Sequence, residues 1–313
     1  MENRNSMNFI DAAMLFNSHQ HRMDPHYKKM LFLTLLSLLL LSECESMSVK
    51  EYSSLPENLK TKDKDDNHGG IKMGVVSKFC DDGKVYLDVD LKDSTIGYKC
   101  EYDINHANQV PFYEVSSDEE EDPPIHVCLP ENITYDKDIP TSGSHRPLWP
   151  IYGGYKYLPP QRWLHSLEHG AAVFLYHPCA DKVNISYFKR IAFGCLKKII
   201  VTPSSKVPKS RPFVVVVYKK KLLMNTVQED VITKFLETND WFVAPEHNVW
   251  TDGIYSLDLQ KSSYNNSLLQ DNYKNICLEE FISTNTTAAA VTTTAATTTA
   301  DNNNNTNYSF QKL

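Results

Sequence analysis

The fold is decided by residues 171–218, which read AAVFLYHPCADKVNISYFKRIAFGCLKKIIVTPSSKVPKSRPFVVVVY. The stretch begins with an apolar run of strand length and ends with another, the β-branched residues 213–218. Between them, residues 185–195 carry apolar side chains at a helical spacing, and residues 198–202 are typical of a strand. A second helix is predicted at residues 228–238. This order predicts an α+β domain in which helices cover one face of a mixed β-sheet.

The chain ahead of this stretch has a less regular pattern. Residues 73–91 predict a β-hairpin that turns at Asp82-Gly83, because apolar and polar residues alternate in its second arm. The acidic run at residues 116–124 predicts a solvated loop. Residues 139–163 are rich in proline and aromatic residues. Proline restricts the backbone and aromatic rings are costly to leave in water, so we expect an ordered, packed coil there.

A segment near the N-terminus has the character of a targeting sequence. Residues 30–41 form an uncharged apolar run after a pair of lysines. This run is too short to span a bilayer but has the length of a signal-peptide core. Cleavage is expected after Cys44 or Ser46, with translation starting at Met1 or Met23. The alternative is an uncleaved signal anchor, which would be the chain's contact with a membrane.

Cysteines and glycosylation motifs also indicate the secretory pathway. Of seven cysteines, cleavage would leave six, an even number that suits a disulfide framework. We expect Cys179 and Cys195 to be bridged, because the ends of a strand and of the following helix would meet. The motif N-x-[ST] occurs in ordinary sequence at Asn132 and Asn184. It occurs again towards the C-terminus at Asn265, Asn285, Asn304 and Asn307.

These features divide the chain into four parts. We expect a signal peptide over residues 1–46, a polar leader over 47–70, an α+β ectodomain over 71–282 and a disordered tail over 283–313. The tail consists largely of Thr, Ala and Asn, which bury too little apolar surface to offset chain entropy. The net charge of −7 argues against nucleic-acid binding. A secreted or cell-surface protein of this kind would have a protein or glycan partner.

The stretch most informative about chemistry is HSLEHG, which begins at His165 and follows His145 by about twenty residues. In a helix ended by Gly170, His165, Glu168 and His169 share one face. In a strand, the two histidines still share a face but Glu168 points away. Paired histidines are therefore expected in either structure.

Three interpretations of this motif remain open. The imidazoles have a structural role, hydrogen-bonded to the proline-rich loop. Alternatively, His145, His165 and His169 hold zinc or copper without catalysis, and Glu168 hydrogen-bonds to a ligand rather than to the ion. Lastly, H-x-x-E-H is a zinc hydrolase pattern in which the glutamate acts as base. A catalytic zinc needs a third protein ligand that no second motif marks, so hydrolysis is the least favoured. The remaining histidines, His126 among them, are assigned no role.

The same motifs resemble a known family. The stretch from Ile139 to Glu246 is similar to the animal tumour-protein-p53-inducible membrane protein family and, more distantly, to a bacterial domain of unknown function built around TSG-x-H and HSLEHG. The resemblance implies an exported domain and, from the animal family, a role in restraining cell growth, but no reaction. It also implies a membrane anchor after the domain, and we expect secretion because no such segment is seen here. The corresponding residues are Thr141, Ser142, Gly143, His145, His165, Glu168, His169 and Gly170.

Export leads to a prediction about expression in animal cells. The chain is expected in the medium, and treatment with N-glycosidase should lower its mass because Asn132 and Asn184 lie in acceptor motifs. The measurement is an immunoblot of medium and lysate with and without the enzyme. Cytosolic retention at the unmodified mass would contradict export.

Overall fold

The computed structural model describes residues 54–62, 66–118, 122–238 and 243–263. From Leu55 onward these residues belong to one compact unit. The predicted signal peptide and tail lie outside the described residues, and so do Cys44, Cys277 and the four C-terminal glycosylation motifs. Within the described ranges, no helix combines the length and apolar character needed to cross a bilayer.

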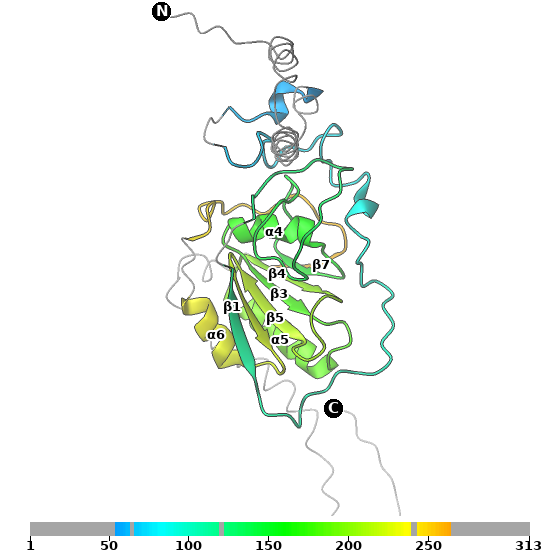
Figure 1. Cartoon of the computed structure of the whole chain (residues 1–313), viewed down its shortest axis with the longest axis vertical. Coiled ribbons are helices and arrows are strands. Elements are labelled where there is room, and N and C mark those ends of the chain that lie inside the picture. The colour runs from blue at the N-terminus through cyan, green and yellow to red at the C-terminus, as the bar shows by residue number, and fades with distance from the viewer. Residues whose placement is uncertain (1–53, 63–65, 119–121, 239–242, 264–313) are drawn as a thin grey trace, which may run out of the picture. The chain divides into compact units, whose positions relative to one another are not determined.

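The domain is built on one seven-stranded mixed sheet in the order β1-β6-β5-β3-β4-β2-β7 (Figure 1). The pairs β3–β4 and β2–β4 are parallel, and the other neighbours are antiparallel. This confirms the predicted α+β class. The strands are β1 (Tyr113–Ser117), β2 (Gly153–Tyr155), β3 (Ala172–Tyr176), β4 (Ile199–Pro203), β5 (Phe213–Val217), β6 (Lys220–Met224) and β7 (Leu259–Ser262). The helices are α4 (Pro160–Glu168), α5 (Lys182–Cys195) and α6 (Glu229–Thr238), with the 3₁₀ turns η2 (Glu57–Leu59) and η3 (Leu87–Val89).

The two faces of the sheet have different covers. Alternate residues of a strand point to opposite faces, so Phe174 packs with α5 and α6 while Val173 packs with α4 and the proline-rich coil. Helices therefore lie on both faces, whereas the sequence predicted them on one. The crossings β2–α4–β3 and β3–α5–β4 run in opposite directions along the sheet. Because crossovers between parallel strands are right-handed, their helices fall on opposite faces.

The prediction of a β-hairpin over residues 73–91 is wrong. These residues form turns and η3, and Val85 in the predicted second arm is 49% exposed. The disulfide Cys80–Cys128 joins this segment to the following coil. Cross-links of this kind, rather than a ladder of backbone hydrogen bonds, hold the segment against the domain.

The packed part of the chain begins before Ile71. The side chain of Leu59 is 1% exposed, and its carbonyl accepts a hydrogen bond of 2.8 Å from the backbone N–H of Lys72. Lys60 and Ile71 form an isolated antiparallel bridge. Part of the segment predicted as a polar leader thus packs on the domain.

The predicted bridge between Cys179 and Cys195 is also wrong. Cys179 is bonded to Cys100, and Cys195 is disulfide-bonded elsewhere. The reason is the direction of α5. Cys179 lies just before this helix and Cys195 ends it, so its 14 residues separate the two cysteines. At 1.5 Å per residue this is roughly 21 Å, far beyond the Cα separation that a disulfide spans.

The packing of α5 leads to a stability prediction. Ile191 is 0% exposed in the core between α5 and the sheet. Replacement by alanine is expected to lower the free energy of unfolding by about 2–5 kcal/mol, because it leaves a cavity. Urea denaturation followed by circular dichroism measures this. The control is Val183→Ala on the same helix, which is 76% exposed and should change the value by less than about 0.5 kcal/mol. Equal effects of the two changes would contradict the packing.

Candidate metal centre

The HSLEHG segment lies at the C-terminal end of helix α4, and a helix is one of the two structures that its sequence left open. Pro160 occupies the first helical position, where its missing N–H costs no hydrogen bond. Gly170 follows the helix with φ of 78°. The backbone N–H of Gly170 donates to Leu167 and that of Ala171 to Ser166, both at 2.9 Å, which satisfies carbonyls of the last turn. The helix therefore presents one histidine- and glutamate-bearing face.

Two contacts fix the C-terminal end of α4. The ammonium group of Lys198 donates to the carbonyls of His169 at 2.6 Å and His247 at 2.8 Å, which places a cation at the negative end of the helix. The backbone N–H of Glu246 donates to the carbonyl of Glu168 at 2.9 Å. The loop that carries Glu246 is thereby held beside the histidines of α4.

Five histidines and two glutamates meet at this helix face, and we call them the histidine cluster. They come from the coil before residue 139, the proline-rich coil over residues 139–163, the C-terminal end of α4 and the loop after α6. Their rings are closely packed, with centroids 4.6 Å apart for His145 and His165 and 4.7 Å apart for His165 and His169. The members are His68, His126, His145, His165, Glu168, His169 and Glu246.

Three of these imidazoles have the same orientation: Nδ1 faces a backbone carbonyl, and Nε2 points inward. The Nδ1 atoms of His126, His145 and His165 lie 2.7, 2.8 and 2.7 Å from the carbonyls of Ile71, Gly143 and Arg146 respectively. A carbonyl only accepts, so each Nδ1 carries the proton and each Nε2 keeps its lone pair. All three Nε2 atoms are buried without a hydrogen-bond partner. The ligand atoms of the three rings lie within 4.8 Å of one another.

Burial sets the protonation state of these three rings. It lowers the pKa of His126 to about 4 and holds the pKa values of His145 and His165 well below the ordinary value for histidine. Neighbouring imidazoles act in the same direction, because like charges repel. The three rings are therefore neutral at physiological pH, and neutral imidazole is the form that binds metal.

The remaining members form two further groups that share Glu246. One group is His165, His169 and Glu246, and the other is His68, Glu168 and Glu246. The Nε2–H of His169 donates to Glu246 at 3.0 Å, and the pKa of Glu246 is lowered although its partial burial acts in the opposite direction. For His68, burial lowers the pKa, but the hydrogen bond and negative charge of Glu168 outweigh it and raise the pKa overall. This side of the cluster is charged, whereas the three-histidine side is neutral.

All the residues predicted from sequence lie in the cluster. His145, His165 and His169 are 0% exposed, and Glu168 is 1% exposed. Their ligand atoms fall into two groups. His145 groups with His165 and His126, while His169 groups with His165 and Glu246.

Sequence reasoning missed His68, His126 and Glu246. Each lies in coil or a turn, away from the HSLEHG motif. His126 reaches the site by a parallel bridge to His145, which pairs two coil segments that no periodicity marks. The position of Glu246 at the end of the stretch that resembles a known family is the one signal that pointed to it.

Arg146 supports the cluster from behind. Its carbonyl receives the Nδ1–H of His165, and its guanidinium forms a bidentate pair with Asp90, at 2.9 and 2.6 Å. The same guanidinium donates to the carbonyls of Val127, Cys128 and Glu131 at 3.1, 2.9 and 2.6 Å. Arg146 is 0% exposed, and its contacts hold coil against the face of the sheet that α4 covers.

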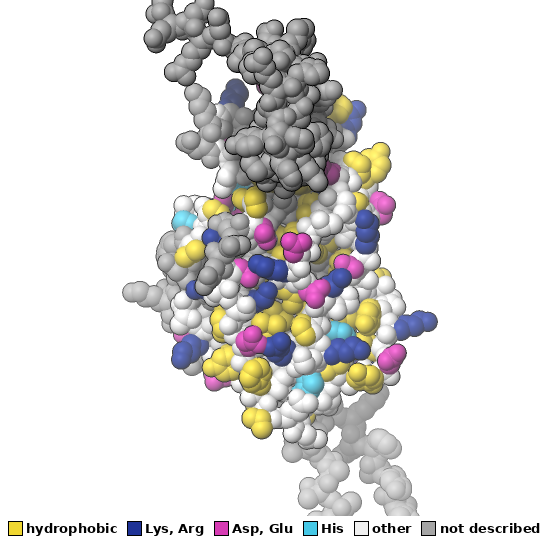
Figure 2. All heavy atoms as spheres, viewed as in Figure 1, with side chains coloured by type: hydrophobic (Ala, Val, Ile, Leu, Met, Phe, Trp, Pro, Cys, Tyr) yellow, Lys and Arg dark blue, Asp and Glu magenta, His cyan; other side chains and the backbone are white. Residues whose placement is uncertain are grey.

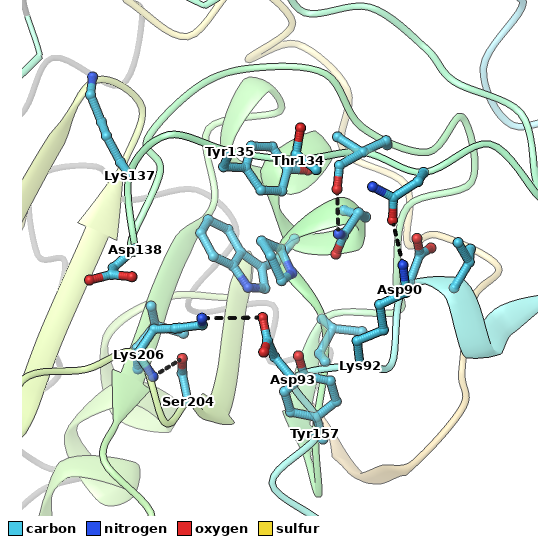
Figure 3. Close-up of a pocket in the computed structure, with 18 residues that line it drawn as sticks. Asp90, Lys92, Asp93, Thr134, Tyr135, Lys137, Asp138, Tyr157, Ser204 and Lys206 are labelled. Atoms are coloured by element: carbon cyan, nitrogen blue, oxygen red, sulfur yellow. Dashed lines mark hydrogen bonds and ion pairs between the residues drawn. The ribbon is translucent and has the colours of Figure 1, made fainter.

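A separate cavity of about 300 Å³ lies beside this network, and Figure 3 shows its lining. Among its charged lining residues, Lys206 pairs with Asp93 at 3.6 Å. Lys92 donates to the side chain of Asn132 at 2.9 Å. Two other cavities, of about 180 and 280 Å³, are also lined by residues outside the histidine cluster. On the face shown in Figure 2, cationic and anionic side chains are likewise interspersed.

One segment of the chain is similar to a family of unknown function. Residues 126–250 match the model of the family described as "Protein of unknown function (DUF3105)". The search of curated proteins and the search of solved structures each gave no match. The matched segment agrees with the resemblance to a domain of unknown function and includes every member of the histidine cluster except His68.

The buried pair of Arg146 and Asp90 leads to a prediction. Asp90→Ala leaves the guanidinium buried without its counter-charge, and we expect the free energy of unfolding to fall by about 3–5 kcal/mol. Chemical denaturation measures the loss. The control is Glu57→Ala, which removes an ion pair to Lys60 at a carboxylate whose side chain is 88% exposed and should leave stability unchanged. Wild-type stability in Asp90→Ala would contradict a supporting role for the pair.

Proposed function

We propose that this chain is an exported glycoprotein whose domain binds a transition-metal ion, zinc or copper, through Nε2 of His126, His145 and His165. The observation that carries the proposal is the convergence of three buried lone pairs, each on a ring whose other nitrogen is fixed by a backbone carbonyl. Metal-binding histidines typically have that second hydrogen bond, which sets the tautomer and the ring orientation.

The energetics support an ion at this point. A buried acceptor without a hydrogen bond costs about 1–3 kcal/mol, and three such nitrogens converge here. One ligand atom of each ring lies within 4.8 Å of those of the other two, so modest side-chain movement would bring three nitrogens around one ion with bonds of about 2.0–2.1 Å. Three neutral imidazoles suit zinc and copper, which bind nitrogen readily.

The ion's role in this proposal is structural. His126 belongs to coil, His145 to the proline-rich coil and His165 to α4, so one ion joins three segments. The three rings are 2%, 0% and 0% exposed. Such burial suits a structural ion, because water or substrate must reach the open position of a catalytic zinc.

Secretion is supported by two features of the described residues. The disulfides Cys80–Cys128 and Cys100–Cys179 fit an oxidising compartment. Asn132 is exposed, as an N-glycosylation site must be. Together with the sequence resemblance, they support the further proposal that the chain is an exported relative of the p53-inducible protein family, with its implied role in restraining cell growth.

A secreted zinc hydrolase is the second candidate, and Glu246 is the observation in its favour. This carboxylate lies with His165 and His169 in one group, so the two histidines of the H-x-x-E-H motif are joined by a third ligand, which is acidic. The burial of His165 and His169 opposes the hydrolase proposal, because substrate must reach the zinc. Zinc-dependent cleavage of a peptide library, lost in Glu168→Gln, would favour the hydrolase over the structural site.

The proposal predicts the metal content of the purified domain. Protein prepared without chelators is expected to contain zinc or copper by elemental analysis. His126→Ala and His145→Ala each remove one of three ligands, and affinity for Zn²⁺ should fall more than about 100-fold, since even residues that only support ligands alter it by about 10–100-fold. Chelator competition measures the affinity.

Removal of the ion should also lower stability. An ion that binds only the folded state at a hundred times its Kd stabilises that state by about 2.7 kcal/mol, so a chelator should lower the Tm of the wild type but not of His126→Ala. The matched control is His106→Ala, which lies outside the cluster and hydrogen-bonds to the carbonyl of Lys209. It should retain both the ion and the response to chelator. A wild-type protein without metal, or equal affinity in His126→Ala, would contradict the proposal.

A further inference from the structure

One carboxylate of the cluster faces two groups of ligands. Oε2 of Glu168 lies 3.1 Å from Nε2 of His68 and 3.6 Å from Nε2 of His145. His145 belongs to the three-histidine site, and His68 belongs to the group with Glu168 and Glu246. Glu168 is therefore placed between two sets of ligand atoms, whereas the sequence analysis expected it to hydrogen-bond to a ligand or, in the hydrolase interpretation, to act as a base.

Glu246 completes the second set. Its Oε1 lies 4.0 Å from Nε2 of His68, and its Oε2 accepts from His169 at 3.0 Å. The hydrogen bond from the backbone N–H of Glu246 to the carbonyl of Glu168 keeps the two residues side by side. One imidazole and two carboxylates thus converge, with ligand atoms within 4.8 Å of one another.

We propose that the centre is binuclear: a second divalent transition-metal ion is held by His68 and Glu246, and the carboxylate of Glu168 bridges it to the ion at His126, His145 and His165. This inference rests on the proposed function, because the bridge needs the first ion. The ligand set of the second ion, one nitrogen donor and two carboxylates, is more oxygen-rich than that of the first and suits Zn²⁺ or Mn²⁺.

Charge and exposure support the second ion. Glu168 is 1% exposed, and a buried carboxylate is stabilised by positive charge beside it, which a metal ion supplies. The side chains of His68 and Glu246 are 10% and 20% exposed, whereas His145 is 0% exposed. The second ion therefore lies on the side of the cluster that is nearer to solvent, where water molecules can complete its coordination, and the first ion lies behind it.

Ion counting on the full chain, by native mass spectrometry after equilibration with Zn²⁺ and removal of loose metal, tests the proposal. The wild type is expected to hold two ions. His68→Gln and Glu246→Gln should hold one, because each removes a ligand of the second ion alone. The control Glu237→Gln, an exposed carboxylate on α6, should hold two. Far-ultraviolet circular dichroism confirms that each variant is folded.

The bridge itself is tested by the distance between the ions. Electron paramagnetic resonance of Mn²⁺- or Cu²⁺-loaded protein should show spin coupling in the wild type, since carboxylate-bridged ions lie about 3.5–4 Å apart in two-metal sites. Glu168→Gln should abolish the coupling. A wild type that holds a single ion, lost in His126→Ala but kept in Glu246→Gln, would overturn the binuclear centre and leave the first site standing. A wild type that holds no ion would overturn both.

Discussion

The bidentate pair between Arg146 and Asp90 is the interaction on which the packing of one face of the sheet depends. That face is covered by α4 and by coil. Coil that is packed in this way has backbone carbonyls that no strand or helix hydrogen-bonds, so other groups must donate to them. The guanidinium of Arg146 donates to three of these carbonyls as well as to Asp90. The carbonyl of the same residue fixes the ring of His165. One buried side chain thus supports both the coil and the site.

A second buried pair works in the same way at the other end of the coil. Arg162, on α4, pairs with Asp81, and its guanidinium also donates to the carbonyl of Leu148. Both partners are 0% exposed at the side chain. Buried ion pairs gain little net stability over apolar packing, but removing one partner is costly. Their contribution here is to position, since Asp81 and Asp90 fix a segment with no strand or α-helix of its own.

The parts of the fold that follow from local periodicity could be predicted from the sequence. Helix α5 begins three residues before its predicted start, and strand β5 ends one residue before its predicted end. Gly170 ends α4 because its positive φ suits glycine. The site could be predicted only in part. His68 meets Glu168 across 100 residues of chain, and His126 meets His145 through a bridge between coils. No periodic pattern encodes such contacts, which arise from the cross-links that fold the coil. The disulfide was predicted incorrectly for a different reason: the predicted helix itself, at 1.5 Å per residue, holds Cys179 and Cys195 apart.

These observations explain why a metal centre would lie on the coil-covered face. The opposite face is covered by α5 and α6, whose backbone hydrogen bonds are internal. Coil lacks that internal order and must be fixed by contacts between distant segments, as the disulfide Cys80–Cys128 and the Arg146 network do. Metal ligation is the same kind of constraint, since each ligand bond fixes one segment relative to the others. The ring of Trp149 packs on His165 and His169, with centroids 5.2 and 4.8 Å away, and helps exclude water from the ligands. In such a dry site the attraction between an ion and its ligands is stronger than at the surface, so the ion would add most where the backbone contributes least.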